Sequence, residues 1–113
     1  MRRGLTLAAA LLAVTTPAAA GTWYWPVAKV MRVLDGTRVR VGTATVRIQS
    51  ETTLCSGQGR SIRRSGVRRW NRFACTYTTF NGRVVGRDLE FRVLVRGQRR
   101  FRIVDAQWVP MPR

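Results

Sequence analysis

Side chains able to perform acid–base or nucleophilic chemistry are few in this chain. Histidine, the usual proton-transfer group near neutral pH, is absent. Asp88 and Glu90 are two residues apart and would share one face of a β-strand, a geometry that paired-carboxylate hydrolases use. With many arginines nearby, we expect ion pairing for both instead. The serines have no histidine base, and we therefore expect that the protein is not an enzyme.

Cofactor and metal motifs are also incomplete. Gly57-Gln58-Gly59 contains the first two glycines of a dinucleotide-binding loop, but no third glycine follows at the required spacing. Structural metal sites use about four ligands, whereas this chain offers two sulfurs and no imidazole. We expect no cofactor and no bound metal.

The only two cysteines are Cys55 and Cys75. In a small exported domain, such a pair is typical of a disulfide. Closing a loop of about 21 residues would remove about 3 kcal/mol of unfolded-state entropy. That is a large share of the roughly 5–10 kcal/mol that stabilises a small domain.

Residues 1–20 have the layout of a secretory signal peptide. Arg2 and Arg3 precede an apolar stretch, and three alanines precede the expected cleavage site before Gly21. The apolar stretch is about half of the roughly 20 residues that a membrane-spanning helix needs. We expect a secreted or extracytoplasmic protein whose mature chain, residues 21–113, is a single domain without a transmembrane segment.

The apolar pattern of the mature chain changes from helical to strand-like. Apolar residues at i, i+3, i+4 and i+7 from Val27 to Leu34 predict a helix over 26–35 that ends at Gly36. The period then becomes two. The strand signals include a bend at Gly42, a short strand over 52–55, two strands over 60–79 that turn at Ser65-Gly66, a hairpin at Asn81-Gly82 with a bulge at Gly86, and a closing loop at Gly97-Gln98-Arg99.

These elements predict an α+β fold. We expect one short N-terminal helix packed on an antiparallel sheet of about four or five strands, with one disulfide. Residues 108–113, which include two prolines, are expected to form an extended and loosely held tail.

The charge of the domain is strongly positive. The chain has 21 basic and 5 acidic residues, so residues 21–113, which exclude Arg2 and Arg3, carry a formal charge of +14. Such a charge opposes compaction and attracts polyanions. Apart from Lys29, all the basic residues of the domain are arginines, whose planar fork fits phosphate and carboxylate. A GC-rich coding sequence would also favour arginine over lysine.

The densest basic cluster surrounds the predicted turn at Ser65-Gly66. It consists of six arginines and one tryptophan, namely Arg60, Arg63, Arg64, Arg68, Arg69, Trp70 and Arg72. A hairpin of this composition can bind phosphates and stack on bases or sugars. A second set, expected on the solvent face of the last two strands, comprises Arg92, Arg96, Arg100 and Arg102. The alternative is that these charges only protect exposed strands from aggregation.

The chain resembles a set of small exported domains of high-GC Gram-positive bacteria. The resemblance lies in a helix that begins at an aromatic-Pro pair, then Cys55-x-Gly57-x-Gly59, then Phe73-x-Cys75 and two closing strands. One helix on an antiparallel meander also resembles the cystatin-like and PepSY-like architectures. The resemblance implies a fold and an exported location, with no activity attached. The Gln-x-Val-x-Gly loop by which cystatins inhibit proteases is absent from this sequence.

Two functions remain open on these grounds. The first is a non-catalytic exported domain that binds polyanions at the cell envelope: wall polymers, anionic lipid at a membrane surface, or nucleic acid. The second is a protein-binding module, such as a protease-inhibitor-like domain, that uses the aromatic N-terminus (Trp23, Tyr24 and Trp25) or a loop. The salt dependence of binding separates the two, because polyanion binding weakens steeply with ionic strength.

Overall fold

The computed structural model describes residues 23–80 and 85–109. The predicted signal peptide, the Asn81-Gly82 turn and the last four residues lie outside these ranges. The elements are α2 (Val27–Leu34), β2 (Arg38–Val41), β3 (Ala44–Arg47), a 3₁₀ turn (Ser50–Thr52), β4 (Thr53–Gly57), β5 (Ser61–Arg64), β6 (Val67–Trp70), β7 (Arg72–Phe80), β8 (Val85–Val95) and β9 (Phe101–Val109).

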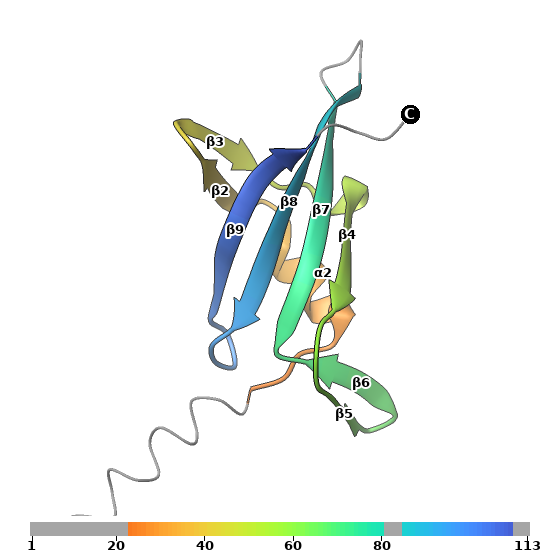
Figure 1. Cartoon of the computed structure of the whole chain (residues 1–113). Helices are drawn as coiled ribbons and strands as arrows, with labels where there is room; N and C mark the ends of the chain where they lie inside the picture. The colour runs from red at the N-terminus through yellow and green to blue at the C-terminus, as the bar shows by residue number, and fades with distance from the viewer. Residues whose placement is uncertain (1–22, 81–84, 110–113) are drawn as a thin grey trace, which may run out of the picture.

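Helix α2 covers one face of a four-stranded antiparallel sheet with the strand order β4-β7-β8-β9 (Figure 1). Two further hairpins, β2–β3 and β5–β6, extend from opposite ends of this sheet. The predicted α+β fold is thereby confirmed. None of the helices in the described part of the chain is long and apolar enough to span a membrane.

Helix α2 forms where its apolar spacing predicts it. Pro26 precedes the helix in an extended conformation, and Gly36, with φ of +83°, follows its end. Val30 and Leu34 are fully buried. They pack against the inward-facing side chains of the sheet in a single hydrophobic core.

The register of β7 and β8 places apolar residues opposite each other. Phe73 pairs with Val93 and Tyr77 with Leu89, all of them buried in the core. Near the β7–β8 connection the register shifts by one residue, so that Thr79 opposes both Gly86 and Arg87. The bulge predicted at Gly86 is therefore confirmed. A Cβ at Gly86 would come within 2.4 Å of Thr79 Oγ1, which explains the glycine.

Both small hairpins turn at residues with a left-handed backbone. Gly42, with φ of +62°, lies between the paired residues Val41 and Ala44. Ser65 and Gly66 have φ of +53° and +78°, as a two-residue hairpin turn requires. Both turns are where the sequence predicts them.

The prediction of only two strands over 60–79 is wrong, because the second is interrupted at Asn71. Before this residue β6 pairs with β5 alone, and after it β7 enters the main sheet. One alternating stretch of sequence thus contributes to two separate sheets.

The last two strands differ from the prediction in two ways: only two of the four predicted arginines lie on them, and β9 is longer than predicted. The Arg96 amide donates to the Arg100 carbonyl over 2.9 Å, which closes the predicted three-residue loop. Arg96 and Arg100 therefore belong to the connection, whereas Arg92 and Arg102 point to the solvent face of the sheet.

Strand β9 also continues to Val109, so Trp108 is not part of a loose tail. Trp108 pairs with Leu89 and packs at the edge of the core. Asp105, with φ of +56°, lies where the β8–β9 register shifts. This bulge moves Ala106 and Trp108 onto the core side.

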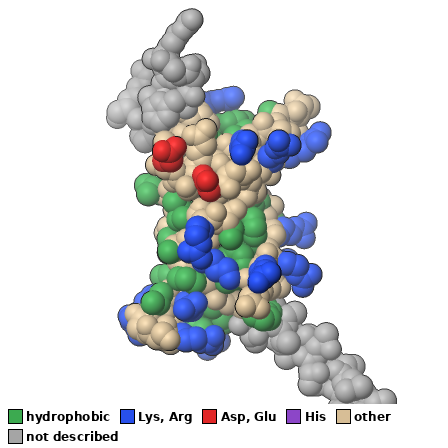
Figure 2. Space-filling view, turned by 180° about the vertical axis from the view of Figure 1, so that it is seen from behind, with side chains coloured by type: hydrophobic (Ala, Val, Ile, Leu, Met, Phe, Trp, Pro, Cys, Tyr) green, Lys and Arg blue, Asp and Glu red, His purple; other side chains and the backbone are tan. Residues whose placement is uncertain are grey.

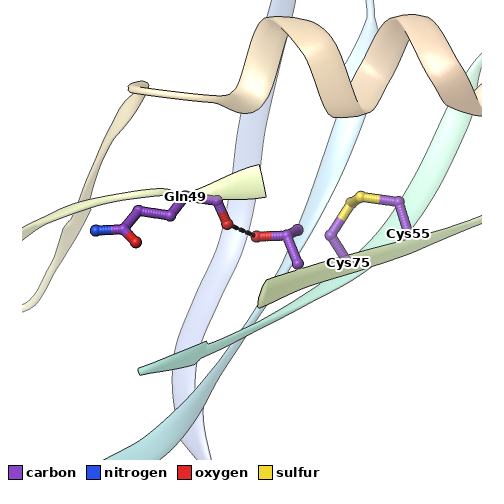
Figure 3. Close-up of a disulfide and its surroundings, with 4 residues drawn as sticks. Gln49, Cys55 and Cys75 are labelled. Atoms are coloured by element: carbon purple, nitrogen blue, oxygen red, sulfur yellow. Dashed lines mark hydrogen bonds between the residues drawn. A yellow bond between two sulfur atoms is a disulfide. The ribbon is translucent and has the colours of Figure 1, made fainter. Parts of the chain in front are cut away.

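The predicted disulfide joins directly opposed residues of β4 and β7. Cys55 and Cys75 are register partners with Cα atoms 4.1 Å apart. Figure 3 shows the bond on the face of the sheet that α2 covers. Beside it, the buried Thr53 hydroxyl donates to the Gln49 carbonyl over 2.7 Å.

Candidate functional site: an arginine hairpin

The predicted basic cluster forms a hairpin, which we call the arginine hairpin (residues 60–72). In it Arg63 pairs with Arg68, Ile62 with Arg69 and Arg64 with Val67. Because side chains alternate between the two faces of a strand, the arginines occupy both faces of the hairpin. The structure therefore brings five of the predicted arginines into one protruding element, namely Arg60, Arg63, Arg64, Arg68 and Arg69. Arg72 lies at its base, in β7, where it pairs with Leu94.

Arg63 and Arg68 are like-charged residues placed directly opposite each other. Like charges in such a pair destabilise a hairpin. The Arg63 Nη1 donates to the Gly66 carbonyl over 3.1 Å, and the Arg68 Nη1 donates to the Ser61 hydroxyl over 2.8 Å. Residues 60–72 contain no Asp or Glu. The positive charge of the hairpin is thus not balanced within it.

Trp70 holds the base of the hairpin to the rest of the domain. Its amide and carbonyl exchange hydrogen bonds of 2.9 and 2.7 Å with Trp25. Its indole lies against Gly57 and meets the Phe73 ring edge-on, with ring centroids 6.0 Å apart. The side chain predicted to stack on a ligand therefore makes its contacts within the protein, at the base of the hairpin.

Three further bonds hold the two ends of the hairpin. The Gln58 amide donates to the Arg72 carbonyl, and the Val95 amide donates to the Asn71 carbonyl, each over 2.9 Å. The disulfide between Cys55 and Cys75 closes the loop that contains the whole hairpin. The base is consequently fixed, while the arginines around the turn are exposed.

The glycines of the Gly57-Gln58-Gly59 motif have structural explanations. A Cβ at Gly57 would lie 2.0 Å from the Trp70 ring, and Gly59 has φ of +73°. A Cβ at Gly59 would also lie 2.8 Å from the Arg72 guanidinium. Both glycines thus permit the close approach of hairpin side chains.

The aromatic N-terminus is divided between the surface and the core. Trp23 is 40% exposed, Tyr24 is half-buried, and Trp25 is only 2% exposed. The Trp25 indole Nε1 donates to the Gly97 carbonyl over 3.1 Å. Trp25 therefore connects the arginine hairpin to the β8–β9 connection, a contact that no local sequence signal indicates.

The second solvent-facing surface is the face of the sheet that α2 does not cover, which we call the open face. It has a hollow of about 750 Å³. Its charged residues are three arginines and three acids, namely Arg72, Arg92, Arg102, Asp88, Glu90 and Asp105. Asp88 accepts a hydrogen bond from the Thr78 hydroxyl over 3.0 Å. The open face is thus nearly neutral in formal charge.

Within the described residues, no three His, Cys, Asp or Glu side chains form a group that could hold a metal ion. No protein-family model, curated protein or solved structure matches this chain.

Proposed function

We propose that this protein is an exported, non-catalytic domain that binds polyanions at the cell envelope through its arginine hairpin. The observation that carries the proposal is the density of unbalanced charge in this hairpin, which has six arginines within residues 60–72 and no acid. The β2–β3 hairpin also pairs two arginines, Arg38 with Arg47, but has only three arginines in all. In the arginine hairpin Arg63 opposes Arg68, and like charges in such a pair repel. An anion bound between the two guanidiniums relieves their repulsion.

The firmly held base supports this proposal. Binding a charged polymer costs conformational entropy for each side chain and loop that becomes ordered. The Trp25–Trp70 bridge and the disulfide fix the base of the hairpin before any ligand arrives. Arginine adds a planar, bidentate donor set that suits phosphate and carboxylate oxygens.

The test is a titration of the full chain, produced in an export-competent host, followed by tryptophan fluorescence. Teichoic acid and DNA are added at low and at near-physiological salt. The hairpin variant is R63Q/R64Q/R68Q/R69Q. The control variant, which removes the same number of charges elsewhere, is R32Q/R38Q/R40Q/R47Q.

We expect the hairpin variant to bind more weakly than the control and to show a flatter dependence of affinity on salt. Each lost phosphate contact lowers the slope of log K against log salt by about 0.7–0.9. Equal losses in the two variants would mean that only net charge matters, and would overturn the proposal. Absence of binding by the wild-type protein at low salt would overturn it as well.

One observation favours a second function, a protein-binding module. The open face combines balanced charges with Leu54, an apolar side chain that is 80% exposed. Binding through this face would withstand salt because it does not rely on net charge. A cross-linked envelope protein that is retained at high salt by the wild type, and lost in Leu54→Asp, would support this second function.

A further inference from the structure

A second basic segment lies at the same end of the sheet as the arginine hairpin. It is the connection between β8 and β9, residues 96–100, in which Arg96, Arg99 and Arg100 are exposed. Figure 1 shows this connection and the β5–β6 hairpin at one end of the sheet, and β2 and β3 at the other. Neither segment contains an acidic residue.

The bases of the two segments are bonded to each other. The Val95 amide, at the end of β8, donates to the carbonyl of Asn71 over 2.9 Å. Trp25 joins them a second time, because its backbone pairs with Trp70 and its indole donates to Gly97. Trp25 is buried, so the geometry between the two segments is set by the core.

Helix α2 adds a further cation at this end. The Lys29 Nζ donates to the Gln98 carbonyl over 2.6 Å and lies 4.7 Å from the centre of the Trp25 ring. Lys29 thus connects helix α2 to the β8–β9 connection through a solvent-exposed hydrogen bond. Together these groups form the basic pole: Lys29, Arg60, Arg63, Arg64, Arg68, Arg69, Arg96, Arg99 and Arg100.

The basic pole holds about half of the positive charge of the domain without an acid in either of its two segments. On the helix side of the molecule, Figure 2 shows basic side chains along the whole length and acidic ones only in the upper part. On this side, a negative ligand therefore meets no acidic side chain at the lower end.

We infer that the basic pole is a single binding surface for a linear phosphodiester polymer, which contacts the arginine hairpin and the β8–β9 connection at the same time. This inference rests on the proposed function and specifies its site and ligand. A single anion reaches only one segment. A polymer bound to one segment presents its next phosphates to the other at a high effective concentration, which strengthens binding without any new type of contact.

The experiment compares two variants that each lose three charges. The variant of the pole is R96Q/R99Q/R100Q, and the control at the other end of the sheet is R38Q/R40Q/R47Q. Poly(glycerol phosphate) and single-stranded DNA serve as phosphodiester ligands, and inorganic phosphate and polyglutamate as comparisons. The substitutions should preserve the loop, because the Arg96–Arg100 hydrogen bond uses only backbone atoms. Circular dichroism verifies the fold of each variant, and intact mass verifies its disulfide.

We expect the pole variant to bind both phosphodiester polymers roughly 50-fold more weakly than the wild type at 0.15 M salt, from three lost contacts with a slope of about 0.7 each. The control variant should lose much less affinity for the polymers. Inorganic phosphate should bind the wild type, the pole variant and the control variant equally weakly. The polymer that the wild type binds more tightly identifies the source of the phosphodiester.

Three outcomes would overturn the inference, and they can be distinguished. If the pole and control variants lose the same affinity for the polymers while the hairpin variant loses more, the proposed function stands and the inference of a joint surface is wrong. If polyglutamate binds as tightly as the phosphodiester polymers, the ligand assignment is wrong. If no polymer binds the wild type, the proposed function itself fails.

Discussion

The Trp70 indole lies so close to Gly57 that a Cβ at residue 57 would come within 2.0 Å of the ring. The same ring meets Phe73 edge-on, so one side chain links the end of β4, the base of the arginine hairpin and the core. The position of the hairpin therefore depends on the absence of a side chain at residue 57.

Gly57→Ala should destabilise the protein by about 1–3 kcal/mol, because the added methyl group displaces a packed indole. Urea denaturation measures the loss, and a shift in tryptophan emission locates it. Gly42→Ala is the control, since that glycine has φ of +62° and no neighbouring atom within 4 Å of the place that a methyl group would occupy. Gly42→Ala should lower the free energy of unfolding by roughly 1–2 kcal/mol through backbone strain alone, and it should leave the tryptophan emission unchanged. Wild-type stability of Gly57→Ala would contradict the tight contact.

Removal of the disulfide in C55A/C75A should lower the free energy of unfolding by about 3 kcal/mol. The bond spans 20 residues of chain and encloses the arginine hairpin, so its loss gives the unfolded chain more freedom. Equilibrium denaturation of the double variant and of the reduced wild type should give similar lowered midpoints. Midpoints equal to that of the oxidised protein would show that the bond contributes little.

Arg68→Glu should stabilise the protein while weakening polyanion binding. A carboxylate opposite Arg63 replaces repulsion by attraction, worth roughly 0.2–1 kcal/mol. Arg40→Glu, opposite the uncharged Thr45, corrects for the general fall in net charge. The stabilisation of Arg68→Glu should exceed that of Arg40→Glu in thermal denaturation. A loss of stability in Arg68→Glu alone would show that the arginine pair does not repel.

Trp25→Phe should loosen the β8–β9 connection. The substitution removes the indole N–H that donates to the Gly97 carbonyl, at a cost of about 1–3 kcal/mol for a buried acceptor left without its donor. Hydrogen exchange should accelerate at the amides of residues 96–100 more than in the centre of β7. Trp23→Phe, at a partly exposed position, should leave both rates unchanged. Unaltered exchange in Trp25→Phe would exclude a role for the indole in holding the connection.

The parts of the fold that follow local rules could be predicted from sequence. Helix α2 follows from apolar spacing, and the turns at Gly42 and Ser65-Gly66 follow from residues that adopt positive φ. The bulge at Gly86 follows from the requirement that apolar residues of paired strands share a face. These features depend on residues that are near in sequence.

Features that depend on distant residues could not be predicted. The division of one alternating stretch at Asn71 arises because β6 meets Trp25, far away in the chain. The extension of β9 to Val109 does not follow from the sequence pattern, because Asp105, a non-glycine residue, adopts φ of +56° and reverses the alternation.

The candidate site also has one part that the local sequence predicts and one part that depends on distant residues. The arginine cluster is recognisable from its density along the sequence. Its proximity to Arg96, Arg99 and Arg100 is not, since it depends on the hydrogen bonds of Trp25 and Asn71. The part played by Trp70 was also beyond prediction, because nothing in the hairpin sequence indicates its contact with Gly57.

The pairing of β4 with β7 has a consequence for how this protein can change. The two strands are direct neighbours whose ladder ends at Gly57 and Phe73, and residues 61–70, between these positions, form a hairpin outside the main sheet. Segments of other lengths and compositions can therefore replace the part of the hairpin around its turn while the sheet and its cross-link stay intact, provided that Trp70 keeps its contacts with Trp25 and Gly57. The ladder thus separates a segment that tolerates insertions and deletions from the strands that do not.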